Sequence, residues 1–258
     1  MKTTKTLAES KANFRFAFNS IRNKDEISHR TNNTGIGKTF EDIVGVKENN
    51  YSKKDWEGNI EIKSTRNTTK SNITLFCYSP SGEATATKFR NDYGKSDLEF
   101  PSFKTLHTTI SAKRKNSYNK TFSFKLVLDD FNQEIKIDVF KYKSNKILED
   151  NIFIMTYNEI LEAFEKKCNC IALIYADVSK TNTGEEIFNF KEGKFLEGAT
   201  KENFLEQLKQ GNIVYEFRHG IYRSGTKKGQ LHDHGSCFRI KKNIIDKLFS
   251  KQEIIWKK

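Results

Sequence analysis

The strongest constraint on the fold is the segment Asp55-Trp-Glu-Gly-Asn-Ile-Glu-Ile-Lys63, in which isoleucines alternate with charged residues. Side chains in a β-strand point alternately to its two faces. The alternation predicts a strand near residues 59–65 whose isoleucines face a core, while Glu61 and Lys63 share the opposite face. A glycine in between allows the chain to turn and brings Asp55 close to the start of that strand.

Two carboxylates and an ammonium group at one strand end suit a hard divalent cation and water-driven attack on a phosphodiester. Asp55 and Glu61 are the expected metal ligands, together with the carbonyl oxygen of Ile62. Lys63 would hold the attacking water and offset the charge that develops on the phosphorane. Glu41, on a predicted helix, adds a third acid that would orient a metal-bound water or complete a second metal site. The expected ion is Mg²⁺, with Mn²⁺ as a substitute.

The alternative interpretation of this segment is a surface strand that carries a Glu–Lys pair, which is common in a lysine-rich protein. The E-x-K triplet alone does not separate the two interpretations. The upstream aspartate and the preceding Glu41 helix favour catalysis.

The charge balance indicates a polyanionic partner. The 258 residues include 45 Lys and Arg against 33 Asp and Glu, which gives a net charge of +12 and a pI near 9.3. Nucleic acid is the first candidate, and a generally basic protein without such a partner is the alternative. Aromatic residues make up 12% of the chain, which is enough apolar surface to argue against disorder.

The sequence has no apolar run of the ~20 residues that a membrane span requires, and its first ten residues lack an apolar signal core. A cytoplasmic protein is therefore expected. The cysteines are Cys77, Cys168, Cys170 and Cys237, and none forms a Cys-x-x-Cys pair. They are expected to be reduced thiols rather than a disulfide framework or a zinc site.

Periodicity and turn residues predict a mixture of helices and strands, so the expected class is α/β or α+β. Helices are expected at 8–22 (Phe14, Phe16, Phe18 and Ile21 forming one packed face), within 34–45 after an initial turn and with Thr39 as N-cap, and at 85–91, 157–167, 202–210 and 243–249. Strands are expected at 59–65, 73–78, 121–128, 134–140, 170–178, 213–222, 237–240 and 253–256, and residues 22–33 are expected to be a loop. Two interwoven lobes are expected, a catalytic lobe over 1–112 and a DNA-recognition lobe over 113–258.

Residues 218–240 form a second informative stretch, which contains three of the five histidines, five Lys or Arg and four Gly. Arginine and histidine can donate to guanine O6 and N7, and aspartate can accept from cytosine N4. Backbone amides around Gly225 and Gly229 could bind phosphates. Candidate DNA-binding residues are Arg218, His219, Tyr222, Arg223, Lys227, Lys228, His232, Asp233, His234 and Arg239.

Three alternatives for this stretch remain open. His232, His234 and Cys237 could bind a metal ion, although a fourth ligand is missing. His232-Asp-His234 could belong to a histidine-metal nuclease in which histidine is the base. The stretch could also be a basic hairpin with solvated charges.

Several separate motifs, in this order along the chain, resemble the MvaI/BcnI-type restriction endonucleases, relatives of the mismatch-repair nickase MutH. They are Thr34-Gly-Ile-Gly-Lys-Thr-Phe-Glu-Asp, the Asp55–Lys63 unit, Arg90-Asn-Asp-Tyr-Gly, Leu106-His-Thr-Thr-Ile-Ser, and Ser224-Gly followed by His232-Asp-His-Gly-Ser-Cys-Phe-Arg-Ile. The resemblance extends over most of the chain, and the order of the motifs is more specific than any one of them.

The resemblance implies a PD-(D/E)xK restriction-endonuclease-like fold, a mixed sheet flanked by helices, with two lobes that form a cleft for duplex DNA. It implies magnesium-dependent hydrolysis that leaves a 5′-phosphate. Asp55, Glu61 and Lys63 match the catalytic triad of the family, and Glu41 matches its helix-borne acid. The positions that match or adjoin base-reading residues are Arg218, Tyr222, His232, Asp233, His234 and Arg239.

The resulting function hypothesis is a type II restriction endonuclease, a site-specific phosphodiester hydrolase of duplex DNA. The family acts as a monomer on short interrupted C/G palindromes such as CCWGG or CCSGG and cuts one strand at a time. No obligate protein partner is expected, while a cognate DNA methyltransferase is. The alternatives are a MutH-like nickase of mismatch repair and a DNA-binding module without catalysis.

Overall fold

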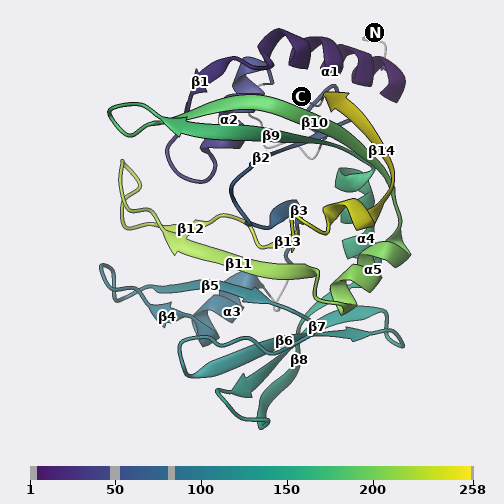
Figure 1. Ribbon diagram of the computed structural model, residues 1–258. Coiled ribbons are helices and arrows are strands. Elements are labelled where there is room, and N and C mark those ends of the chain that lie inside the picture. The colour runs from purple at the N-terminus through teal and green to yellow at the C-terminus, as the bar shows by residue number, and fades with distance from the viewer. Residues whose placement is uncertain (1–4, 47–52, 81–84, 257–258) are drawn as a thin grey trace. The chain divides into compact units, whose positions relative to one another are not determined.

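The computed structural model describes residues 5–46, 53–80 and 85–256 (Figure 1). The chain divides into two compact units, each made of separate segments. Unit 1 contains residues 1–73, 165–200 and 242–258, and unit 2 contains residues 74–164 and 201–241. Their strands and helices form a mixed α+β fold, which confirms the expected class.

Unit 1 is built around a mixed sheet with the strand order β1-β10-β9-β2, in which β14 also pairs with β10. The strands are β1 (Asp25–Ile27), β2 (Glu61–Arg66), β9 (Cys170–Lys180), β10 (Glu186–Ala199) and β14 (Phe249–Trp256). Strand β2 runs parallel to β9, while the other pairs are antiparallel. A parallel pair needs a long connection between its strands. Here that connection contains most of unit 2. Neither unit begins or ends at residues 112/113, where a single boundary between the lobes was expected.

Helices α1 (Leu7–Ile21) and α2 (Gly35–Ile43) contribute to the core of unit 1. Helix α1 begins with a capping box, in which Thr6 and Glu9 bond each other's backbone amides. Phe14 and Phe18 lie four residues apart and are buried in the core with residues of β2, β9 and β10. Phe16, expected on the same face, is 81% exposed because a residue two positions away points to the other side of a helix.

Unit 2 contains a five-stranded sheet path, β3-β13-β11-β5-β4, with β12 paired to β11, and a three-stranded sheet, β6-β7-β8. These strands are β3 (Ile73–Cys77), β4 (Lys95–Ser96), β5 (Lys104–Ile110), β6 (Phe122–Asp129), β7 (Glu134–Lys141), β8 (Ile147–Thr156), β11 (Ile213–Ile221), β12 (Leu231–Asp233) and β13 (Cys237–Ile240). Helices α3 (Ala86–Tyr93) and α5 (Lys201–Lys209) belong to this unit, and the chain passes from unit 2 to unit 1 within α4 (Tyr157–Cys168).

Most expected elements are confirmed, and the differences have local causes. Thr34 rather than Thr39 precedes α2; Thr39 lies inside the helix, and its hydroxyl accepts a hydrogen bond from the amide of His29. The expected loop 22–33 contains the short strand β1, which is held by pairing with β10. The expected helix at 243–249 is a 3₁₀ turn, η2 (Ile245–Leu248).

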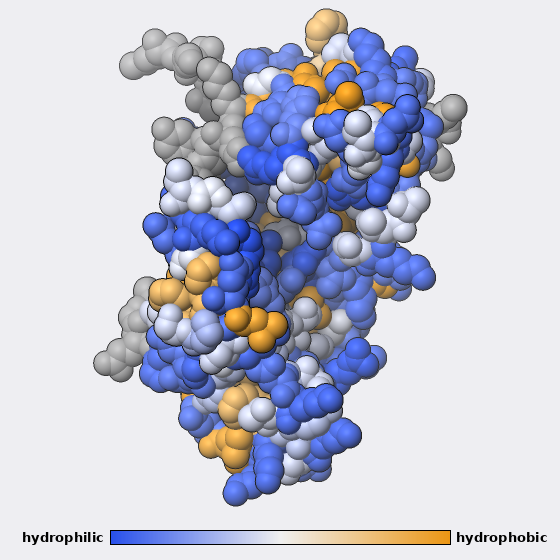
Figure 2. All heavy atoms as spheres, turned by 90° about the vertical axis from the view of Figure 1, so that its left-hand side faces the viewer, coloured by the Kyte–Doolittle hydropathy of each residue, from blue (hydrophilic) through white to orange (hydrophobic). Residues whose placement is uncertain are grey.

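The surface is rich in charged residues, as the composition requires. On the face drawn in Figure 2, hydrophilic side chains predominate and hydrophobic ones are scattered among them. Among the described residues, no helix is both long enough and apolar enough to cross a membrane.

Candidate active site and nucleic-acid interface

The first candidate site forms around the turn that precedes β2. The amide of Trp56 donates to the carbonyl of Ile60 at 2.9 Å, and Gly58 adopts a positive φ of 76°, which a glycine tolerates without strain. The turn brings Asp55 back onto the strand, where its Oδ2 accepts a hydrogen bond from the amide of Ile62 at 2.9 Å. The aspartate is therefore fixed beside β2 by local backbone geometry.

The strand presents its two faces as the alternation predicts. Ile60 and Ile62 are 0% and 4% exposed and belong to the core of unit 1. Lys63 Nζ lies 2.7 Å from Glu61 Oε1, so the acid and the base share the other face. Glu61 is itself only 5% exposed, which makes its negative charge dependent on nearby cations.

In this site, Asp55 and Glu61 repel each other, and Lys63 attracts both. The pKa of Asp55 is raised, first by burial and then by repulsion from Glu61. Burial opposes the charge on Lys63, but attraction to Glu61 and Asp55 outweighs it and raises the pKa of Lys63. Lys63 is therefore a cation at neutral pH, which suits charge stabilisation rather than proton abstraction.

A second lysine, which sequence reasoning missed, completes this cluster. Lys167, near the end of α4, places its Nζ 3.1 Å from Glu61 Oε2 and 3.2 Å from the carbonyl oxygen of Lys53. Glu61 is thus held by one lysine on each carboxylate oxygen. No local sequence pattern could have indicated this pair, because the two residues are 106 positions apart.

The donor set fits a hard divalent cation in part. Asp55 and Glu61 provide two carboxylates whose mutual repulsion a cation would relieve, and Mg²⁺ commonly takes one or two carboxylates and several waters. Among the described residues, no group of three or more His, Cys, Asp and Glu side chains gathers as a metal site. Glu41 lies on α2, which packs against β2.

The second candidate site lies in unit 2 on β11, β12 and the loops that follow them. The ring of His232 stacks on Tyr222 with centroids 4.0 Å apart and lies 3.7 Å from the ring of His234. The pKa of His234 is lowered, first by burial and then by the neighbouring His232. A neutral imidazole can donate one hydrogen bond and accept another, as base edges require.

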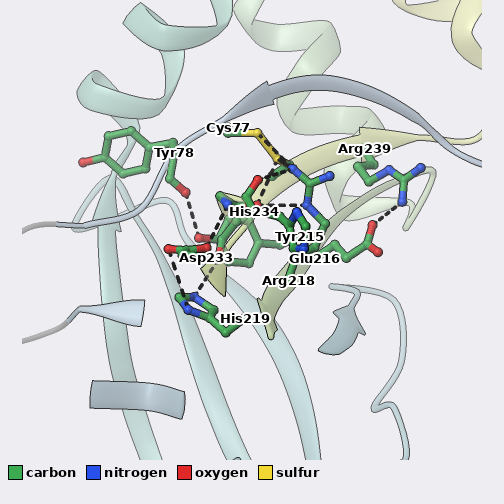
Figure 3. The surroundings of a disulfide bond; sticks show 12 residues. Cys77, Tyr78, Tyr215, Glu216, Arg218, His219, Asp233, His234 and Arg239 are labelled. Atoms are coloured by element: carbon green, nitrogen blue, oxygen red, sulfur yellow. Dashed lines mark hydrogen bonds and ion pairs between the residues drawn. A yellow bond between two sulfur atoms is a disulfide. The ribbon is translucent and has the colours of Figure 1, made fainter. Parts of the chain in front are cut away.

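Arg218, on β11, binds the backbone of the turn that carries the last ring of this stack. Its guanidinium donates to the carbonyl oxygens of Gly235 at 2.9 Å and of His234 at 2.7 Å, and its Nη2 lies 2.8 Å from Cys237 Sγ (Figure 3). The side chain is therefore used within the protein in this structure, and it fixes the turn that carries His234.

Cys77 and Cys237 form a disulfide bond, so the expectation that all four cysteines are reduced thiols is wrong for this pair (Figure 3). The pairing joins neighbouring strands β3 and β13, whose residues are 160 positions apart. Sequence spacing could not indicate it, because only the sheet order brings these strands together. Cys168 and Cys170 are free and buried, as expected.

Other candidate readers differ in accessibility. His219 is 1% exposed, and burial lowers its pKa, which makes it a buried support rather than a surface group. Its Nδ1 lies 3.7 Å from Asp233 Oδ2, and Asp233 also accepts from the amide of Gly235 at 2.7 Å. Arg239 forms an ion pair with Glu216 on the neighbouring strand β11.

The basic loop after β11 is tied to an acidic turn. Arg223 Nη1 lies 2.8 Å from Asp97 Oδ1, and Lys228 Nζ lies 2.9 Å from Glu99 Oε1. The ion pair with Arg223 lowers the pKa of Asp97. Lys227 places its Nζ 5.7 Å from the centre of the Tyr222 ring. Among these basic residues, Arg223 and Lys228 therefore order the loop internally.

Two further residues lie near the candidate reading residues, His107 beside His234 and Arg90 within electrostatic reach of Asp233, although neither was among the candidates. His107, on β5, lines a cavity of about 590 Å³ together with Arg223 and His234. Arg90, on α3, is 7% exposed and donates to the side-chain oxygen of Asn91. Both lie in motifs that carry the family resemblance, which was the available signal.

Comparison with known proteins agrees with this geometry. The model of the MvaI/BcnI restriction endonuclease family matches residues 17–249. The solved structure of restriction endonuclease MvaI with its cognate DNA substrate has a TM-score of 0.86 and 30% identity, over 99% of both chains. MvaI in the absence of DNA has a TM-score of 0.57 and 28% identity, over 99% of this chain and 100% of that chain.

A search of curated protein sequences finds no significant match. The family model, however, spans most of the sequence, and the fold is shared with a solved restriction enzyme at 30% identity. The chain therefore belongs to the MvaI/BcnI restriction endonuclease family and is a restriction endonuclease.

Proposed function

We propose that the protein hydrolyses duplex DNA at a short, interrupted C/G palindrome of the CCWGG or CCSGG kind in a reaction that requires Mg²⁺. The observation that carries this proposal is the convergence of Asp55, Glu61 and Lys63 at the start of β2. The MvaI structure that this chain resembles at 30% identity was solved with cognate DNA, which supports duplex DNA as the substrate.

In the proposed reaction, Asp55, Glu61 and the Ile62 carbonyl would hold the divalent ion, which supplies charge neutralisation at the scissile phosphate. Lys63, a cation at neutral pH, orients the attacking water and stabilises the negative charge that develops on the phosphorane oxygens. Hydrolysis then leaves a 5′-phosphate. Glu41, on the helix beside β2, would orient a water molecule or complete a second metal site.

Site recognition is assigned to the surface around the Tyr222–His232–His234 stack. Its imidazoles and arginines match the acceptors of guanine, and Asp233 matches the donor of cytosine. Basic residues such as Lys113, Arg114 and Lys227 would contact phosphates and set affinity and salt dependence without sequence selection. His219 and Arg223, which lie in internal contacts, would act by positioning their neighbours.

The proposed enzyme acts as a monomer that nicks one strand at a time, in the cytoplasm and without an obligate protein partner. A cognate DNA methyltransferase would protect the host genome from it. Membership of the MvaI/BcnI family supports these features of the proposal. A MutH-like nickase is the competing function, and it differs in needing partner proteins to become active.

The decisive experiment incubates the pure protein with a fully sequenced plasmid and Mg²⁺ and maps the ends of the fragments. The expected result is cleavage at one recurring short palindrome, with 5′-phosphate ends and no activity in excess chelator. Omission of all other proteins separates this function from a partner-dependent nickase. Absence of cutting under these conditions, or nicks at random sequences, would refute the proposal.

A further inference from the structure

The Cys77–Cys237 disulfide lies beside Arg218, whose guanidinium also binds the carbonyl oxygen of His234 in the candidate reading surface (Figure 3). Cys237 begins β13 and immediately follows the turn at residues 234–236. A Cβ added to Gly235 would meet Cys77 Sγ at 3.6 Å, so this turn packs against the disulfide. The turn also carries His234, the last ring of the Tyr222–His232–His234 stack.

The two sulfur atoms have unequal surroundings. Cys77 is exposed, whereas Cys237 is 0% exposed. The guanidinium of Arg218 lies 2.8 Å from the sulfur of Cys237 and 3.6 Å from that of Cys77. A neighbouring guanidinium favours a thiolate. The pair therefore has one sulfur open to attack and one sulfur prepared to leave.

Hydrogen bonds also hold this turn. Arg218 donates to the carbonyl oxygens of His234 and Gly235, and Asp233 accepts from the amide of Gly235 at 2.7 Å. Ser236 accepts from the amide of Tyr78 at 3.0 Å, and His234 donates its amide to the carbonyl of Arg218 at 3.2 Å. The disulfide is the covalent link between β3 and the start of β13, which directly follows this turn. Its loss would leave the position of His234 to Arg218 and these hydrogen bonds.

We propose that Cys77 and Cys237 form a thiol-modification site, a reversible disulfide whose reduction by a low-molecular-weight thiol loosens the 234–236 turn and weakens site-specific DNA binding. The effect on binding depends on the proposed function, because it assumes that this turn reads DNA. The reversible chemistry of the pair does not depend on it.

The reaction is thiol–disulfide exchange. A thiolate of the reductant attacks the sulfur of Cys77, the S–S bond breaks, and Cys237 leaves as a thiolate beside Arg218. A second thiolate attacks the reductant sulfur of the mixed disulfide and releases Cys77. In total, two reductant thiols become one disulfide, and the protein pair gains two electrons and two protons. An oxidised low-molecular-weight disulfide reverses each step.

The first part of the test measures the redox state of the full-length protein. The protein is equilibrated with defined ratios of reduced to oxidised glutathione and alkylated, and the modified cysteines are located by mass spectrometry. We expect Cys77 and Cys237 to gain or lose alkylation together across these ratios. A pair that stays fully reduced under oxidising ratios, or fully oxidised under reducing ratios, would overturn the proposal.

The second part measures binding without cleavage, in Ca²⁺, to the mapped site and to a scrambled duplex. Reduction is expected to raise the Kd for the specific duplex on the order of fivefold and to leave the scrambled duplex unchanged. By linkage, the specific duplex should shift the glutathione equilibrium of the pair toward the disulfide by the same factor. An unchanged specific Kd, or an equal loss on both duplexes, would contradict the proposal.

Variants separate the cross-link from the other thiols. Cys77→Ser, Cys77→Ala and the double variant Cys77→Ser/Cys237→Ser should bind like the reduced protein in every buffer. The double variant keeps Cys168 and Cys170, so a remaining redox response would assign the effect to them and refute this site. If the protein binds the specific and the scrambled duplex equally in both redox states, the proposed base-reading function is refuted, and the proposed redox effect on specific binding is refuted with it. If it distinguishes them equally well in both redox states, this inference alone fails.

Discussion

The two candidate sites are built in opposite ways. In unit 1, Asp55, Glu61 and Lys63 lie within nine consecutive residues, and one turn and one strand place them. In unit 2, the candidate reading surface takes residues from β5, β11, β12 and β13 and from the loops between them. A catalytic centre can thus be encoded locally, while a surface that must match several base pairs needs a whole sheet.

The sites also differ in how their charged groups are used. In the candidate catalytic site, Asp55 and Glu61 repel each other and both attract Lys63, so a divalent ion would be stabilised there. Most arginines of the candidate reading surface already bind other groups of the protein, Arg218 through two carbonyl oxygens and Arg223 through Asp97. Catalysis should therefore fail abruptly when one group is lost, whereas recognition should weaken in graded steps.

The sharpest test of the local site is Asp55→Ala. Loss of this carboxylate should lower the cleavage rate at least about 100-fold, because metal and charge stabilisation are lost together, while specific binding persists. The rate is measured on the mapped plasmid, and binding is measured by anisotropy. Glu57→Ala is the matched control, since Glu57 lies in the same turn but binds Lys5 and Asn13, and it should be dispensable for cleavage. Undiminished cleavage by Asp55→Ala would remove the catalytic assignment.

Recognition should respond less steeply to Arg239→Ala. We expect the free energy of specific binding to weaken by about 1–3 kcal/mol, with little change on random DNA. The substitution removes the proposed base contact and the ion pair that Glu216 forms with Arg239. Lys241→Ala, at a nearby basic position beyond the strand, is the control. An equal loss of affinity on random DNA would instead make Arg239 a phosphate contact.

Lys167 tests whether the local site depends on distant residues. Its ammonium binds one carboxylate oxygen of Glu61 and therefore competes with the metal ion for that oxygen. Lys167→Met should lower the metal concentration for half-maximal cleavage about two- to fivefold, the effect of removing one partly screened ion pair. Direct Mn²⁺ binding, followed by electron paramagnetic resonance without DNA, provides a second measurement. Lys166→Met is the control. If Lys167→Met instead raises the metal concentration for half-maximal cleavage, Lys167 helps the site to bind the ion and does not compete with it.

The smallest effect is expected for Lys227→Ala. This exposed cation should contribute to phosphate binding alone, so its loss should weaken specific and random duplexes alike and reduce the slope of log K against log salt by about 1. Titrations at several salt concentrations measure both quantities. A selective loss on the specific duplex would move Lys227 into the base-reading group.

Helices and strands whose buried apolar residues recur at a constant spacing were predictable from the sequence. Strands in which this spacing is interrupted were not. Phe14 and Phe18 of α1 keep the helical spacing of four, and β9 has one apolar run, although Phe16 was wrongly placed on the buried face. Strand β10 was not predicted, because its pairing register shifts between Phe190 and Glu192. The buried residues are at even-numbered positions before this shift and mainly at odd-numbered positions after it. Strand β8 has similar irregularities in its pairing with β7.

The sequence by itself determined the candidate catalytic unit, because a period-two alternation and one turn place Asp55, Glu61 and Lys63 through bonds that lie close together in the chain. Only the tertiary structure decided that Lys167 holds Glu61, that Cys77 meets Cys237 and that Asp97 binds Arg223. These contacts join residues more than 100 positions apart. Their formation depends on the order of strands in each sheet, which no local pattern records.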